Sequence, residues 1–110
     1  MPWDTLLVAE AVREIEAIEG REREAIENAM KKLQALGPQL GYPHSSAVRG
    51  GTDLRELRPR AGRSRWRAFY RRVGEAYVVA AIGPEAKIDP RGFDRAVAAA
   101  EKRLDELEVD

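Results

Sequence analysis

The middle of this 110-residue chain is dominated by arginine. Residues 49–72 contain nine arginines, no lysine and two acidic residues, so nine minus two gives a net charge of +7. The flanks are acidic: residues 1–48 hold five basic and eight acidic residues, and residues 73–110 hold five and nine. Such a segment repels itself unless anions lie close by. Because arginine makes bidentate contacts with phosphate and carboxylate, the segment predicts a polyanion-binding surface. The alternative is a solvated hairpin whose charges only maintain solubility.

The same segment contains a strand pattern that constrains the fold. Alternation places Trp66, Ala68 and Tyr70 on one face of a strand over Arg65–Arg71. The other face carries Arg65, Arg67, Phe69 and Arg71, and we expect its arginines to form one partly solvent-facing set. A turn over residues 72–75 and the wholly apolar run Ala76–Ile82 then predict a hairpin whose second strand is buried and central.

The flanking residues predict helices and short strands around this hairpin. Trp3–Ala9 reads as a first strand, and helical spacing of apolar residues over 8–18 and 21–36 indicates a helical hairpin that ends at Gly37-Pro38. Asp89 followed by Pro90 is a typical start for a last helix, which runs to about Leu107. Between these elements we expect short strands at Ala47–Arg49 and Thr52–Arg58, separated from the arginine strand by the loop Pro59–Ser64. The order predicts a single α+β domain over residues 1–110 with a mainly antiparallel sheet.

Composition removes several classes of function. The chain has no cysteine and one histidine, which excludes disulfides and thiolate chemistry and leaves little for a transition-metal site. Its longest apolar run, Ala76–Ile82, is far too short to span a bilayer, and no secretory signal pattern opens the chain. We therefore expect a cytoplasmic protein that needs no metal and no cofactor.

The cationic residues suit the chemistry of RNA. Cleaving RNA without a metal needs a base for the 2′-hydroxyl, cations around the phosphorane and an acid for the leaving oxygen. Fixed arginines fit the second role. Lys87 is a candidate base, because crowding by like charges lowers a lysine pKa from about 10.4. His44 lies in a loop, where a lone histidine is more often a surface residue than a catalyst. From the residues alone, polyanion binding is the stronger expectation and catalysis the weaker one.

Two motifs carry a resemblance to a known family. Glu56-Leu57-Arg58 is followed, after a glycine-containing turn, by the aromatic-Arg-x-aromatic-aromatic pattern of Trp66–Tyr70. In this order and spacing the chain resembles the RelE/ParE superfamily of type II toxins, and within it the phage-associated HigB-like branch, over nearly its whole length. The resemblance implies a RelE-like fold, in which an N-terminal helical hairpin and a C-terminal helix pack a small sheet. It also implies a metal-independent endoribonuclease that cleaves mRNA on the ribosome by 2′-hydroxyl attack, inhibits translation and is neutralised by a helix-turn-helix antitoxin.

The resemblance also assigns roles to particular residues. It implies catalytic roles for Arg58, Arg67 and Lys87, with Arg67 stabilising the transition-state phosphate. Independently of the resemblance, three further arginines of the segment and the histidine are expected to contact RNA: Arg49, Arg65, Arg71 and His44. No Tyr or His follows Tyr77, so the residues leave the general acid unassigned, and a protonated arginine or lysine could assist. Two alternatives stay open, a ParE-like toxin that binds DNA gyrase and a non-enzymatic nucleic-acid-binding module.

Overall fold

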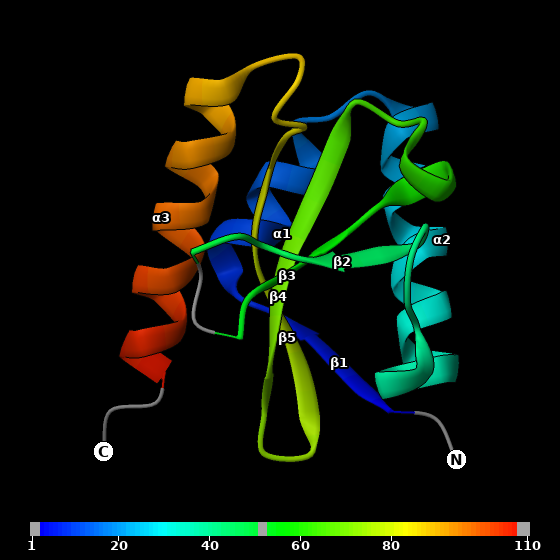
Figure 1. The fold of residues 1–110 in the computed structure, drawn as a ribbon, viewed down its shortest axis with the longest axis vertical. Helices are drawn as coiled ribbons and strands as arrows, with labels where there is room; N and C mark the ends of the chain where they lie inside the picture. The colour runs from blue at the N-terminus through cyan, green and yellow to red at the C-terminus, as the bar shows by residue number, and fades with distance from the viewer. Residues whose placement is uncertain (1–2, 51–52, 108–110) are drawn as a thin grey trace.

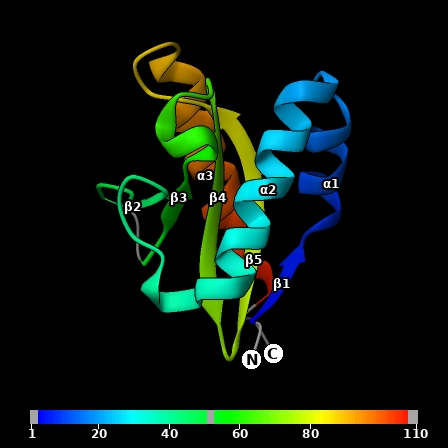
Figure 2. The same cartoon turned by 90° about the vertical axis from the view of Figure 1, so that its right-hand side faces the viewer.

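The computed structural model describes residues 3–50 and 53–107, which form a five-stranded sheet with helices on both faces (Figures 1 and 2). The sheet order is β1-β5-β4-β3-β2, in which β1 runs parallel to β5 and every other neighbouring pair is antiparallel. The strands are β1 (Asp4–Leu7), β2 (Ser45–Ala47), β3 (Arg55–Leu57), β4 (Trp66–Val73) and β5 (Ala76–Pro84). The helices are α1 (Ala9–Glu16), α2 (Gly20–Leu36) and α3 (Pro90–Leu107), with short 3-10 turns η1 (Gly37–Gln39) and η2 (Pro59–Gly62). The predicted α+β fold class is confirmed.

The long hairpin β4–β5 forms the centre of the sheet, as the sequence predicts. The hairpin separates two apolar cores, one under α1 and α2 and one under α3. Ala68 and Tyr70 face the first core and Phe69 faces the second, which confirms the predicted alternation. A bulge between Phe69 and Tyr70 shifts the pairing with β5 by one residue. In the part of the chain that the structure describes, no helix is long and apolar enough to cross a membrane.

The boundaries of several elements differ from the sequence-based expectations. β2 begins two residues before the predicted strand at Ala47–Arg49, and β3 is shorter than the predicted Thr52–Arg58, whose first residue lies outside the described part. At the start of α3 the expected cap is present, because Asp89 accepts a hydrogen bond from the Gly92 backbone N–H at 2.9 Å. The apolar stripe of α3 is buried against the sheet through Ala96, Ala100 and Leu104.

The expected open arginine face on β4 is wrong. Arg67 and Arg71 are only 3% and 8% exposed. Arg67 is enclosed by carboxylates and backbone carbonyls of β3, turn η2 and the segment after β5, whereas Arg71 lies against α3. Arg71 forms ion pairs with Glu101 and Asp105 of α3 at 3.7 and 3.6 Å. Arg65 alone of the predicted set is exposed, and its guanidinium lies 5.5 Å from the centre of the Trp66 ring. The alternation of the strand is as predicted, but its buried arginines are paired with acidic groups of the protein itself, Arg71 with α3 and Arg67 with Glu56 and Glu85.

Candidate nucleic-acid interface

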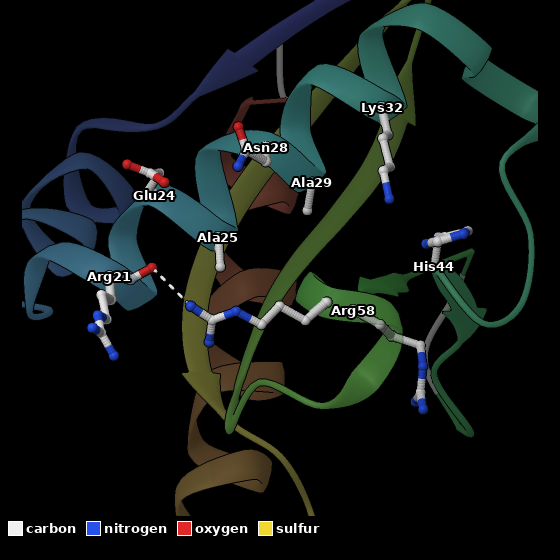
Figure 3. A pocket seen from close by; sticks show the side chains of 9 residues that line it. Arg21, Glu24, Ala25, Asn28, Ala29, Lys32, His44 and Arg58 are labelled. Carbon is white, nitrogen blue, oxygen red and sulfur yellow. Dashed lines mark hydrogen bonds between the residues drawn. The ribbon is translucent and has the colours of Figure 1, made fainter.

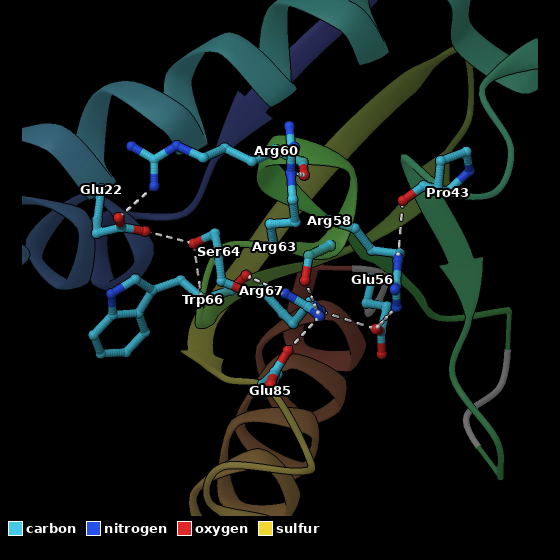
Figure 4. A network of polar contacts seen from close by, with 11 residues as sticks. Glu22, Pro43, Glu56, Arg58, Arg60, Arg63, Ser64, Trp66, Arg67 and Glu85 are labelled. Carbon is cyan, nitrogen blue, oxygen red and sulfur yellow. Dashed lines mark hydrogen bonds and ion pairs between the residues drawn. The ribbon is translucent and has the colours of Figure 1, made fainter.

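Arg67 is the centre of a buried polar network (Figure 4). Its side chain has five N–H donors, and five acceptors are present around it. Two are carboxylates: Glu56 accepts from Nε at 3.2 Å and Glu85 accepts from one terminal nitrogen at 2.7 Å. The other three are backbone carbonyls, at Gly62, Ser64 and Trp66. The arginine expected to stabilise a transition-state phosphate therefore holds together strands β3 and β4, turn η2 and the end of β5.

Arg58 lies beside this network and is only partly buried. Its Nε donates to the Pro43 carbonyl at 3.0 Å, and one terminal nitrogen lies 3.2 Å from the same Glu56 oxygen that Arg67 contacts. The guanidinium also lies 5.1 Å from the centre of the Tyr42 ring. Gly62, at φ +93°, makes room for it, since a Cβ there would come within 2.5 Å of an Arg58 terminal nitrogen. Arg58 is thus fixed in place while part of its guanidinium still faces the surface.

The surface that Arg58 faces is a cleft of about 390 Å³, which lies between α2 on one side and the His44 loop and turn η2 on the other (Figure 3). We call it the cationic cleft, because four cationic side chains and one acidic side chain line it together with the only histidine. The α2 wall carries a stripe at helical spacing, and the buried Ala25 and Ala29 lie along its floor. The polar lining residues are Arg21, Glu24, Asn28, Lys32, His44, Arg58 and Arg60.

Local backbone contacts place His44 at the opening. The His44 backbone N–H donates to the Gly41 carbonyl at 2.9 Å, and the His44 carbonyl accepts from the Arg58 backbone N–H at 2.8 Å. The imidazole is half-buried, and Lys32 projects from α2 towards the loop that carries it (Figure 3). Two residues that the sequence singles out, His44 and Arg58, are therefore brought together in one cleft.

The opposite end of the cleft is held by Glu22. It accepts hydrogen bonds from the Ser64 hydroxyl and from the Arg60 guanidinium, and these bonds hold the pKa of its carboxyl below the ordinary value. Arg60 and Ala61 both have φ of +55°, a left-handed turn that directs the chain from β3 back towards α2. A second Arg60 nitrogen donates to the Arg21 carbonyl at 3.3 Å. These contacts pin turn η2 to the start of α2.

The remaining predicted site residues lie outside the cleft. Lys87 is exposed on the turn between β5 and α3, two residues beyond Glu85, and Arg49 is exposed after β2. Arg21, Lys32 and Arg60 line the cleft and were not predicted as site residues. Their signal in the sequence is weak, because a polar stripe beside the apolar stripe of a helix most often marks a solvent-exposed face. Within the described ranges, no group of three or more acidic or histidine side chains is arranged to hold a metal ion.

Comparison with known proteins identifies the family. The sequence profile described as Phage derived protein Gp49-like (DUF891) matches residues 13–83, more than half of the chain. The protein belongs to this Gp49-like family, which is the phage-associated type of relative that the two motifs indicate. No curated protein matches the sequence significantly.

Among solved structures, the fold is similar to that of the E. coli toxin RelE, in a mutant with two arginines replaced by alanine, in the free state. The TM-score is 0.64 at 17% sequence identity, over 89% of this chain and 97% of the other. The expected RelE-like fold is thereby confirmed.

Proposed function

We propose that this protein is the toxin of a type II toxin–antitoxin system and that it contacts RNA through the cationic cleft. The observation that carries the proposal is the cleft itself, which Arg21, Lys32 and Arg58 line together with the only histidine. The shape and charge of the cleft suit the phosphate backbone of a single RNA strand. The family of the protein and its RelE-like fold support its assignment as a toxin. Its proposed partners are mRNA, the ribosome and a helix-turn-helix antitoxin.

The reaction that fits this cleft is metal-independent cleavage of mRNA on the ribosome, which inhibits translation. His44 takes the proton of the 2′-hydroxyl, and the 2′-oxygen attacks the adjacent phosphorus. The bond from phosphorus to the 5′-oxygen breaks, and the leaving oxygen takes a proton from Lys32. The products are a 2′,3′-cyclic phosphate and a free 5′-hydroxyl. Arg58, whose guanidinium is only partly occupied by Pro43 and Glu56, stabilises the charge on the phosphorane.

Residues outside the cleft extend the proposed contact surface. Arg49, Arg65 and Lys87 are exposed and available to the backbone of a longer RNA. Arg71 is paired with α3 and so contributes mainly to the fold. An acidic antitoxin segment is proposed to cover the cleft and not Arg67 and Arg71 of β4, because both are buried and already paired with acidic groups of the protein.

The second candidate is a toxin or regulator that binds nucleic acid, or a protein such as gyrase, without cleaving RNA. One observation favours it: every donor of Arg67 is matched by an acceptor of the protein itself. The arginine to which the resemblance gives the transition-state role is therefore closed to a phosphate in this structure.

Mapping of new 5′ ends on ribosome-bound mRNA after induced expression separates the two candidates. The nuclease proposal predicts new ends that appear with the parent and that His44→Gln reduces by about 10²-fold or more, since positioned proton transfer contributes about 10²–10⁴ in rate. A message with a 2′-deoxy sugar at the cut position should resist cleavage. Growth arrest without new 5′ ends would support the second candidate and overturn the first.

A further inference from the structure

A second pocket, of about 570 Å³, lies at the C-terminal end of α2, between η1 and the sheet. The sheet contributes the start of β3, the end of β4 and the start of β5. We call it the tyrosine pocket, because Tyr70 and Tyr77 line it. Their rings pack edge to face with centroids 5.8 Å apart. Its volume lies within the range of small-molecule sites, about 300–1,000 Å³. Neither the toxin proposal nor the RNA-contact roles above use this pocket.

Arg55 points a fixed guanidinium group at this pocket. It lies opposite Tyr70 in the sheet, and its Nε donates to the Ser45 hydroxyl at 3.0 Å. The buried Ser45 hydroxyl in turn hydrogen-bonds the Tyr70 hydroxyl. Among the described residues, no acceptor hydrogen-bonds the two terminal nitrogens of Arg55. A side chain held at Nε with its terminal donors left over is already ordered for an anion, which lowers the cost of binding.

Arg72 and Tyr77 add donors from the neighbouring strands. The Arg72 guanidinium lies over the Trp3 ring, 5.0 Å from its centre, and its Nε donates to the Gly74 carbonyl at 3.0 Å. Among residues 3–50 and 53–107, no acceptor hydrogen-bonds its terminal nitrogens either. Tyr77 is 5% exposed, and no described group hydrogen-bonds its hydroxyl. Burial raises the pKa of Tyr77, which keeps that hydroxyl protonated and able to donate.

The lining as a whole matches one class of ligand. Two guanidinium groups and a phenol suit a phosphate, and the carboxylate of Asp53 can accept hydrogen bonds from ribose hydroxyls. We propose that the tyrosine pocket binds a nucleotide, with its phosphate between Arg55 and Arg72. The nucleotide is either a free nucleoside monophosphate or one residue of an RNA strand. This inference does not depend on RNA cleavage at the cationic cleft.

The test is calorimetric titration of the full chain with adenosine 5′-monophosphate, adenosine, inorganic phosphate and a five-residue oligoribonucleotide. We expect saturable 1:1 binding of the monophosphate, or of the oligoribonucleotide alone if the natural ligand is a residue of RNA. Arg55→Gln and Arg72→Gln should each weaken binding about tenfold, the effect of losing a charge-assisted hydrogen bond. Lys102→Gln, which removes an exposed cation of α3, should change the affinity less than twofold.

Four outcomes would overturn the proposal. The first is no saturable binding of either ligand, and the second is an equal loss in Lys102→Gln. The third is loss of binding in the cleft variant Arg21→Gln/Lys32→Gln while Arg55→Gln and Arg72→Gln bind normally. Arg72 is exposed, so its variant remains informative if Arg55→Gln melts early. The fourth is binding of an acidic peptide by a protein that binds none of the nucleotides. None of these results affects the 5′-end mapping, which tests RNA cleavage at the cationic cleft separately.

Discussion

Arg67 shows how a residue expected to act on a substrate can instead be part of the fold. It connects Glu56 on β3 with Glu85 beyond the central hairpin, at 3.2 and 2.7 Å, while only 3% of it is exposed. A buried ion pair of this kind adds little net stability compared with apolar residues, but removing one partner leaves the other charge buried and unpaired.

We therefore predict that Arg67→Met destabilises the protein by about 3 kcal/mol, within the usual range for breaking a buried pair. Urea denaturation followed by circular dichroism measures this. The matched control is Arg65→Met, which removes the exposed arginine just before β4 and should cost less than about 1 kcal/mol. If Arg67→Met unfolds at the same urea concentration as the parent, the network of Figure 4 has no structural role.

Glu22 gives a prediction that depends on pH. Hydrogen bonds from Ser64 and then from Arg60 lower the pKa of its carboxyl in the folded state. A lowered folded pKa contributes stability that is present above the unfolded pKa and is lost as the pH falls through the folded value.

We expect Glu22→Gln to be less stable than the parent at pH 7 and to approach it as the pH falls below about 4.3, the ordinary pKa of glutamate. The difference at pH 7 should not exceed about 1 kcal/mol, because the pair lies near the surface. Unfolding free energies at pH 7, 5 and 3 test this, with the exposed Glu24→Gln as a control that should show no such convergence. A gap that is constant from pH 7 to pH 3 would rule out the carboxylate as its source.

At the scale of the elements, β5 is longer than the strand that pairs with its outer edge. β1 pairs with Ala76–Val79 and then ends, so the edge of β5 continues without a neighbouring strand. Two charged side chains hydrogen-bond the backbone of β5 along this unpaired part of its edge. Arg103 of α3 donates to the Ala80 carbonyl at 2.9 Å, and Glu14 of α1 accepts from the Ile82 backbone N–H at 2.9 Å. Glu14 and Arg103 also pair with each other at 3.0 Å, which joins α1, β5 and α3.

We predict that Glu14→Ala costs about 1–3 kcal/mol, the usual cost of leaving a largely buried donor without its acceptor. Hydrogen exchange at the Ile82 amide should become faster along with the loss of stability. Glu16→Ala, an exposed neighbour on the same helix, is the control and should change neither quantity. Unchanged exchange at Ile82 would mean that another group satisfies this edge.

How far the sequence predicts these elements depends on the type of signal. The hairpin over β4 and β5 follows from alternation and from an apolar run, and the cap at Asp89 follows from Asp-Pro; all are local signals. The parallel pairing of β1 with β5 is not local, because it joins residues about seventy positions apart. The short β2 and β3 carry too few residues for a clear period. For this reason their boundaries are displaced in the sequence-based prediction while the long elements are found.

At the scale of the whole molecule, part of the charge imbalance of the sequence is resolved within the fold. The acidic flanks supply Glu22 to Arg60, Glu85 to Arg67, and Glu101 with Asp105 to Arg71. Composition predicts an anionic partner for the arginine segment, but it cannot tell an external partner from an internal one. The cationic cleft was missed for a related reason: its walls, α2 and the His44–Arg60 region, come together only in the folded chain (Figure 3).

The central claim is that RNA phosphates bind in the cationic cleft. The most direct test is the affinity for a single-stranded oligoribonucleotide as a function of salt, for the parent and the double variant Arg21→Gln/Lys32→Gln. Both residues are exposed on the cleft wall, so the fold should be unaffected. The control is Arg91→Gln/Arg95→Gln, which removes two exposed arginines from α3.

We predict that the cleft variant binds at least about tenfold more weakly at low salt and that its slope of log K against log salt is shallower by about 1.4, or about 0.7 for each lost phosphate contact on a single strand. The α3 variant should keep the affinity and slope of the parent. Equal losses in the two variants, or an unchanged slope in the cleft variant, would contradict the assignment of the cleft as the RNA-binding site.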